Sequence, residues 1–181
     1  MKRCLPLPAG TLRPSRPDDL EAVLSLFQDD QVSQTLFGGE SADRARVIGL
    51  QEESDRLDNQ GLGIWVIESR SPETTAGIVG LQPVPDAPEP LLEMIGGVEL
   101  IIALFPAYWG QGLAAEACRA VLNYAHDNLG LVAIFASVDQ PNARSHRLLQ
   151  KLGFRILDNQ RAEESRLVHY QRSSASAEER K

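Results

Sequence analysis

Residues 99–125, ELIIALFPAYWGQGLAAEACRAVLNYA, decide the fold of this chain. The apolar run 100–105 predicts a strand, and the alanine-rich segment that begins at Ala114 predicts a helix. The turn between them carries Gly110 and Gly112. Amides at the start of a helix have no intrahelical acceptor, and a glycine lets a phosphate approach the backbone without a Cβ in the way. The segment therefore predicts a strand, an anion-binding loop and a helix.

Two common nucleotide-binding motifs also contain closely spaced glycines. The dinucleotide-binding fingerprint has a third glycine or an alanine and comes early in its domain. Here Ala115 stands at that third position, but the loop comes late in the chain, after several strands of antiparallel type. No lysine follows Gly112, which excludes a phosphate-binding loop of the GKS/T kind. A nucleotide-binding protein is therefore a disfavoured alternative.

Outside this segment, hydrophobic periodicity and turn residues predict short strands and helices in alternation. Ser41 is the expected N-cap of the second helix, and Asn142 begins the last one. The prolines of PVPDAPEP, residues 83–90, predict a stiff connection between two strands. The expected strands are 11–13, 63–68, 76–81, 98–104, 132–138, 154–157 and 167–170, and the expected helices are 17–27, 41–57, 114–128 and 142–152. The pattern is that of an α+β domain around a mixed sheet, over residues 11–171, with flexible ends at 1–10 and 172–181.

Composition excludes several classes of protein. The 181 residues suit one domain, and the formal net charge of −7 argues against a nucleic-acid binder. The two cysteines and three histidines lack metal-ligand spacing, so no metal site is expected. The longest apolar run is too short to span a membrane, and the first ten residues make a poor secretory signal, so we expect a cytoplasmic protein. Monomer and homodimer both stay open.

The order of these motifs resembles the GCN5-related N-acetyltransferase (GNAT) family. LFPAYWGQGLAAEA is followed by a helix, a strand and then DQPNARSHRLLQKLGF, and the likeness covers roughly residues 11–171. It is strongest to the branch that contains the ribosomal-protein N-terminal acetyltransferases. The family loop is Arg/Gln-x-x-Gly-x-Gly/Ala, and Trp109 departs from its basic first position. The resemblance implies a mostly antiparallel, splayed sheet flanked by helices, and acetyl-CoA as the acyl donor.

The resemblance also implies which residues contact acetyl-CoA. Loop amides would hold the pyrophosphate, and the backbone of the strand 98–104 would pair with pantetheine like an added strand. A backbone N–H near Ala103 or Leu104 would polarise the thioester carbonyl. The side chain of Asn142 would contact the pantetheine arm, as well as serving as an N-cap. The expected cofactor-binding residues are Ile102, Ala103, Leu104, Trp109, Gly110, Gln111, Gly112, Leu113, Ala114, Ala115, Asn142 and Ser145.

Transfer to an amine favours a general base and a proton donor. Glu99 is the first candidate for the base, because it is an acid on the strand that leads into the acyl site, and Glu93 is the second. Many relatives place a tyrosine proton donor where this chain has Leu149. Ser145 is the alternative donor to the leaving thiolate, which otherwise leaves unassisted.

The function expected from these residues is acetyl transfer from acetyl-CoA to a primary amine, either a protein N-terminus or a small amine metabolite. The missing tyrosine and the uncertain base leave one alternative open, a catalytically weak acyl-CoA-binding sensor or subunit. The segments around 35–39 and 83–90 are the expected walls of the acceptor pocket, because they are the least patterned.

Overall fold

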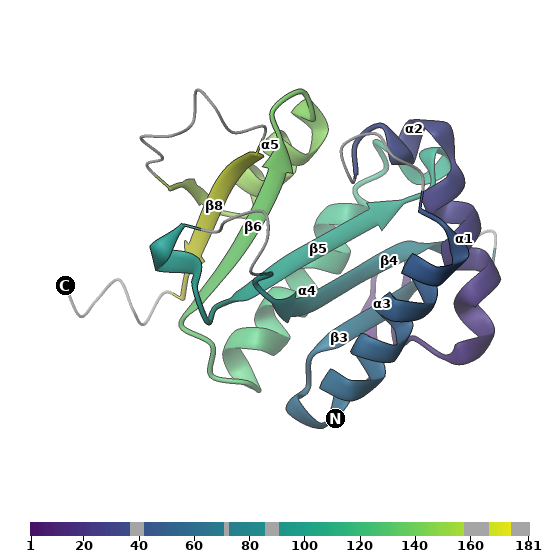
Figure 1. The fold of residues 1–181 in the computed structure, drawn as a ribbon, viewed down its shortest axis with the longest axis horizontal. Helices are drawn as coiled ribbons and strands as arrows, with labels where there is room; N and C mark the ends of the chain where they lie inside the picture. Colours follow the sequence, from purple (N-terminus) through teal and green to yellow (C-terminus); the bar gives the residue numbers. More distant parts are fainter. Residues whose placement is uncertain (37–41, 71–72, 86–90, 158–166, 175–181) are drawn as a thin grey trace.

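The computed structural model describes residues 1–36, 42–70, 73–85, 91–157 and 167–174. They form one mixed sheet with helices on both faces (Figure 1). The strand order is β1-β2-β3-β4-β5-β6-β8-β7, and all neighbours are antiparallel except β5 and β6. The strands are β1 (Leu5–Leu7), β2 (Gly10–Pro14), β3 (Gly63–Arg70), β4 (Glu73–Pro83), β5 (Val98–Leu104), β6 (Ala133–Asp139), β7 (Arg155–Ile156) and β8 (Leu167–Ser173).

Helices cover the two faces of the sheet and define two cores. In Figure 1, α1 and α3 lie in front of β3 and β4, and α4 lies behind them. Trp65 of β3 belongs to the core under α4, whereas the preceding residue, Ile64, belongs to the core under α1 and α3, as the two-residue period of a strand requires. The helices are α1 (Leu20–Gln28), α2 (Asp30–Ser33), α3 (Arg44–Leu57), α4 (Leu113–Asp127) and α5 (Ala143–Lys151). Short 3-10 turns occur at η1 (Pro17–Asp19), η3 (Asp58–Gln60), η4 (Leu92–Met94) and η5 (Pro106–Tyr108).

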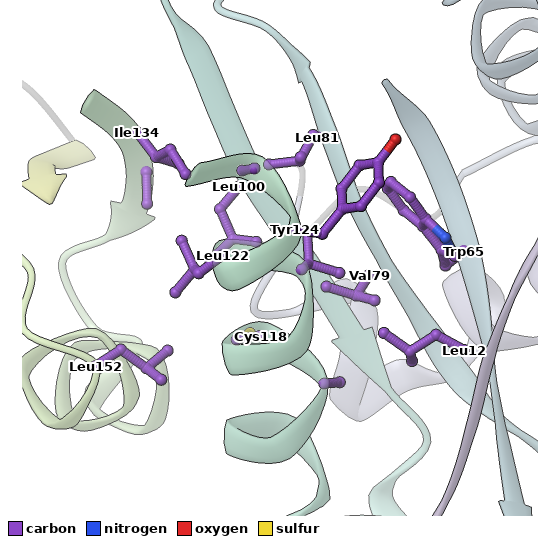
Figure 2. Close-up of a cluster of buried hydrophobic side chains, with 14 of the residues drawn as sticks. Leu12, Trp65, Val79, Leu81, Leu100, Cys118, Leu122, Tyr124, Ile134 and Leu152 are labelled. Carbon is purple, nitrogen blue, oxygen red and sulfur yellow. The ribbon is translucent and has the colours of Figure 1, made fainter. Parts of the chain in front are cut away.

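The larger core fixes α4, and with it the glycine loop, against the sheet. Figure 2 shows Cys118, Leu122 and Tyr124 of α4 beside apolar side chains from β2 to β6. Trp65 is fully buried and meets the Tyr124 ring edge-on, with ring centroids 5.4 Å apart. Burial raises the pKa of the Cys118 thiol to about 12, so this cysteine is a packing residue. Trp65 likewise belongs to the core.

β5 and β6 form the one parallel pair among the described strands, and they separate soon after they meet. α4 supplies the crossover between them, as a parallel connection requires. Their register contains a single pair, Glu99 with Phe135, and Figure 1 shows the two strands diverging beyond it. Residues 100–104 therefore keep an edge that β6 does not cover. The predicted splayed, mostly antiparallel α+β sheet is confirmed.

Most predicted elements occur, with four corrections. Residues 1–10 are not all flexible, because Leu5 and Leu7 are buried in the main core and pair with β2. The N-cap of α3 is Asp43, whose side chain accepts the Arg46 N–H, and not Ser41, which lies outside the described residues. The short helix α2 was not predicted from the sequence. Of the expected tail at 172–181, residues 172 and 173 belong to β8 and residues 175–181 lie outside the described part.

Candidate active site

The glycine loop leaves an open, uncapped helix end. Gly112 is the N-cap of α4 with φ 85°, and Gly110 has φ 77°, so both adopt the left-handed conformation that glycine favours. Gly112 has no side chain to cap the helix, so the amides of the first turn keep their capacity to donate. A Cβ added at either glycine would meet no atom within 4 Å. The backbone here fits an anion of the size of a phosphate.

A cavity of about 420 Å³, the glycine-loop cavity, opens in front of this helix end. Arg144, Arg147 and Lys151 of α5 line it, and no acidic side chain does so among the described residues. The cavity therefore combines a helix N-terminus with three cationic side chains, an environment that favours a polyanion. Its other lining residues are Val32, Thr35, Leu36, Ile102, Ala103, Leu104, Tyr108, Trp109, Gly110, Gly112, Ala114, Ala115, Asn142, Ser145 and Leu148.

Trp109 joins the loop to both β5 and α5. Its indole Nε1 donates to the Leu104 carbonyl over 2.8 Å. The Arg144 guanidinium lies over its ring, 4.1 Å from the centroid, in a cation–π contact. The tryptophan at the first position of the loop thus holds an arginine from α5 at the wall of the cavity.

The free edge of β5 presents backbone groups to the same cavity. Phe105 N donates to the Ala76 carbonyl, and the Ala103 carbonyl lies against Gly77, so both residues face β4. Successive residues direct their backbone groups to opposite edges of a strand. Ile102 and Leu104 therefore face the open edge. Of the two residues predicted to polarise a thioester carbonyl, Leu104 has its N–H on that edge.

A second cavity of about 220 Å³, the Glu99 cavity, adjoins the first. Glu99 and Asp139 line it, and none of the described residues that line it is basic. The two cavities meet at Thr35, Leu36, Ile102, Ala103, Asn142, Ser145 and Leu148, which line both. Along the free edge of β5 the structure therefore changes from a cationic to an acidic surface.

The Glu99 carboxyl group lies where β5 and β6 separate, next to the single residue pair that joins the two strands. Its side chain is 6 % exposed. It accepts hydrogen bonds from the Ser137 hydroxyl, the Gln82 side chain and the Ser137 N–H. Burial raises the pKa of Glu99, and these hydrogen bonds oppose that rise because they favour the ionised form. A buried carboxylate with a raised pKa beside a cavity is a candidate general base.

Asn142 and Ser145 lie at the junction of the two cavities. The Asn142 side chain caps α5 by accepting the Ser145 N–H over 3.1 Å, and its amide donates to the Thr35 carbonyl over 3.4 Å. Leu149 is buried and lines the Glu99 cavity, so the wall of the cavity is apolar at this position.

Comparisons with known proteins fit this geometry. The family model of the acetyltransferase (GNAT) domain matches residues 11–155. The chain belongs to the GNAT acetyltransferase family. It is 30% identical to an uncharacterized N-acetyltransferase, YoaA, of Bacillus subtilis over 79% of this chain and 77% of that protein. It is 33% identical to spermidine N(1)-acetyltransferase of Escherichia coli over 32% of this chain and 31% of that enzyme. The solved structure of RimL, a ribosomal L7/L12 alpha-N-protein acetyltransferase, in complex with coenzyme A, shares the fold with a TM-score of 0.74 and 14% identity, over 94% of this chain and 98% of RimL.

Ten of the twelve residues predicted to bind the GNAT acyl donor line the glycine-loop cavity. The exceptions are Gln111, whose amide donates to the Ala107 carbonyl, and Leu113, whose side chain lies in the core. Of the two candidate bases, Glu99 lines a cavity, whereas Glu93 is an exposed residue of η4 that lines neither. Ser145 lines both cavities.

Sequence reasoning missed several residues of the site. Arg144, Arg147 and Lys151 follow helical spacing, and that pattern was a usable signal for a cationic face on α5. Nothing in the local sequence connects Ser137 or Gln82 to Glu99. Their proximity comes from the pairing of β5 with β6 and β4.

Two classes of feature are absent from the described residues, namely a membrane-spanning helix and a cluster of metal ligands. No helix there has the length and apolarity needed to cross a membrane. No group of three or more metal-ligating side chains of the His, Cys, Asp and Glu types occurs in that part of the chain either.

Proposed function

We propose that this GNAT acetyltransferase binds acetyl-CoA in the glycine-loop cavity and receives a primary amine from the Glu99 cavity. The main support for this proposal is that the two adjoining cavities carry opposite charges. Three cationic side chains and a helix N-terminus line the glycine-loop cavity, and two acidic side chains line the Glu99 cavity. The diphosphate of acetyl-CoA is a polyanion, and an amine approaches as a cation. The thioester would lie where the cavities meet, beside the free edge of β5.

The chemistry needs an uncharged amine. A protein α-amino group has a pKa near 7.7–8.0, and its deprotonation at neutral pH costs about 1 kcal/mol, whereas a lysine-type amine costs roughly 4 kcal/mol. Glu99 would accept that proton, directly or through a water molecule. The free amine then forms a bond to the thioester carbon, while the Leu104 N–H stabilises the oxyanion. As the C–S bond breaks, the Ser145 hydroxyl would relay to the leaving thiolate the proton that the newly bonded nitrogen releases, so that the products are the amide and the thiol of CoA.

The Glu99 cavity favours small or slender amines as acceptors. Its volume is about 220 Å³, its walls are largely apolar, and its charges are acidic. An aliphatic amine or an exposed protein N-terminus fits these properties, whereas an acceptor with a carboxylate beside its amine does not. The identity with a spermidine acetyltransferase over about a third of this chain supports an amine acceptor.

Two measurements test the proposal. Acetyl-CoA should raise the Tm of the protein, whereas NAD and ATP should not, because only the former extends from the glycine loop along β5. Thiol release from acetyl-CoA should then exceed the water blank for at least some members of a panel of aliphatic polyamines, N-terminal peptides and amino acids. Stabilisation by NAD or ATP without stabilisation by acetyl-CoA would contradict the proposal.

Leu149 supports one alternative function, that of an acyl-CoA-binding sensor or subunit. Its buried apolar side chain occupies the place of a tyrosine proton donor in relatives. Stabilisation by acetyl-CoA combined with no thiol release across the whole panel would favour this alternative over catalysis.

The cationic side of the glycine-loop cavity can be tested with a matched pair of arginines. Arg147→Gln should weaken CoA binding by about fivefold at low salt and by less at high salt, because one exposed charge near a phosphate contributes about 1 kcal/mol and is screened. Arg119→Gln removes an exposed arginine of α4 that lines neither cavity, and its affinity should stay near that of the parent protein. Titration calorimetry with CoA at two salt concentrations measures both. Equal losses in the two variants would show that overall charge, and not this surface, governs binding.

A further inference from the structure

Two more polar side chains extend from Glu99, namely Ser137, which also lines the Glu99 cavity, and His169 beyond it. Ser137 of β6 donates its hydroxyl to Glu99. The Ser137 oxygen is in turn 3.1 Å from Nδ1 of His169 on β8. His169 is 6 % exposed and does not line the Glu99 cavity. Three side chains from three strands thus form a continuous line of hydrogen bonds, in which Glu99 and His169 are buried and Ser137 is partly buried.

The pairing of the strands explains why these side chains meet. Ser137 and His169 are directly opposed in the antiparallel pair of β6 and β8, so their side chains lie on the same face. The His169 carbonyl accepts the Leu157 N–H on its other side, towards β7. The backbone of Ser137 is then directed towards β5, where its N–H reaches the Glu99 carboxyl group.

The direction of the hydrogen bonds follows from the available protons. A carboxylate only accepts hydrogen bonds, and a hydroxyl has one proton, so Ser137 donates to ionised Glu99. The Ser137 oxygen then accepts from His169, which requires the proton of the imidazole to be on Nδ1. Burial lowers the pKa of His169, which favours its neutral form. The whole chain is therefore ordered to suit an ionised Glu99.

We propose that Ser137 and His169 are positioning residues for Glu99. His169 fixes the Ser137 hydroxyl as a donor to the Glu99 carboxylate, and this bond holds the carboxylate so that it faces the acceptor amine as a base. The inference rests on the proposed function of Glu99. Two titratable groups share the surroundings of Glu99, namely Asp139 in the same cavity and His169 behind it. The other described residues of that cavity, including those contributed by α1, α3 and the residues after α2, are not titratable.

Ser137→Ala tests the first link. It removes a donor that favours the ionised carboxylate, so the pKa of Glu99 should rise. The acid limb of the kcat/KM profile should move up by about one pH unit, so that kcat/KM at a pH on that limb should fall about tenfold. Ser137→Thr retains a hydroxyl on a residue that suits a strand and should restore the profile. The KM for acetyl-CoA should stay unchanged in both variants.

Three histidine variants test the second link. His169→Leu removes the donor to Ser137 and should shift the acid limb in the same direction as Ser137→Ala. His169→Gln keeps an N–H that can reach the hydroxyl and should stay closer to the parent enzyme. His126→Leu changes a histidine that bonds to the Leu131 carbonyl and Arg172 and lines neither cavity, so its acid limb should not move.

The outcomes separate this inference from the proposed function. If Glu99→Gln lowers the rate strongly while Ser137→Ala and His169→Leu keep the parent pH profile, the positioning role is wrong and the base stands. If Glu99→Gln leaves the rate and its pH dependence unchanged, both the base and the positioning role fail. Should His169→Leu not fold, Ser137→Ala and Ser137→Thr alone decide the inference.

Discussion

Glu99→Gln is expected to lower kcat/KM by about 10²- to 10⁴-fold, the usual contribution of a general base. The amide preserves the size of the side chain but does not accept the proton of the amine. Because burial raises the pKa of Glu99, the activity of the parent enzyme should fall as the pH decreases through that raised pKa, where the base becomes protonated. The variant should lose this acid limb. A pH series of thiol-release rates with a reactive amine measures both effects.

The matched control for this variant is Glu93→Gln. Glu93 is an exposed acid of η4 that lines neither cavity, so the substitution should leave the rate and the acid limb near those of the parent enzyme. The affinity for acetyl-CoA should be preserved in both variants, because neither acid lines the glycine-loop cavity. An acid limb that survives in Glu99→Gln would remove Glu99 from the mechanism.

Gly112→Ala is expected to weaken the binding of CoA by at least about tenfold. Gly112 lines the glycine-loop cavity at the N-terminus of α4, and the space in front of its Cα is empty. An added methyl group would occupy the position from which a phosphate contacts the first-turn amides. The φ of 85° also strains any residue with a Cβ, which lowers stability by roughly 1–2 kcal/mol.

Gly130→Ala separates the effect on phosphate binding from the effect of backbone strain. Gly130 follows α4 at its other end, has φ 67°, and has empty space in front of its Cα as well. It lines neither cavity, so the substitution should reproduce the strain and leave CoA binding intact. Tm measurements should show similar losses for both variants, whereas titration with CoA should distinguish them. If the two variants bind CoA equally well, the diphosphate does not lie on the amides of this helix end.

Local signals predicted the glycine-loop side of the site. The apolar run before the loop, the two glycines and the alanine-rich helix each act within a few residues of the chain. The same holds for Asn142, which caps α5 through a residue three positions later. Helix starts, turns and left-handed glycines depend on neighbouring residues, so the sequence by itself determines them. The first strand was missed because Leu5–Leu7 has only three residues, and its stability comes from pairing with β2 and burial in the core.

The surroundings of Glu99 depended on the tertiary structure. The sequence identified an acid on a strand, but it did not distinguish a base from a solvated side chain. Ser137 and Gln82 come from the two strands that flank β5, and His169 comes from a strand beyond β6. The division of charge between the two cavities likewise requires α5 to lie across from the end of α4. A carboxylate acquires its proton affinity from burial and from the donors around it, and those donors reach Glu99 only when strands far apart in the chain pair in one sheet.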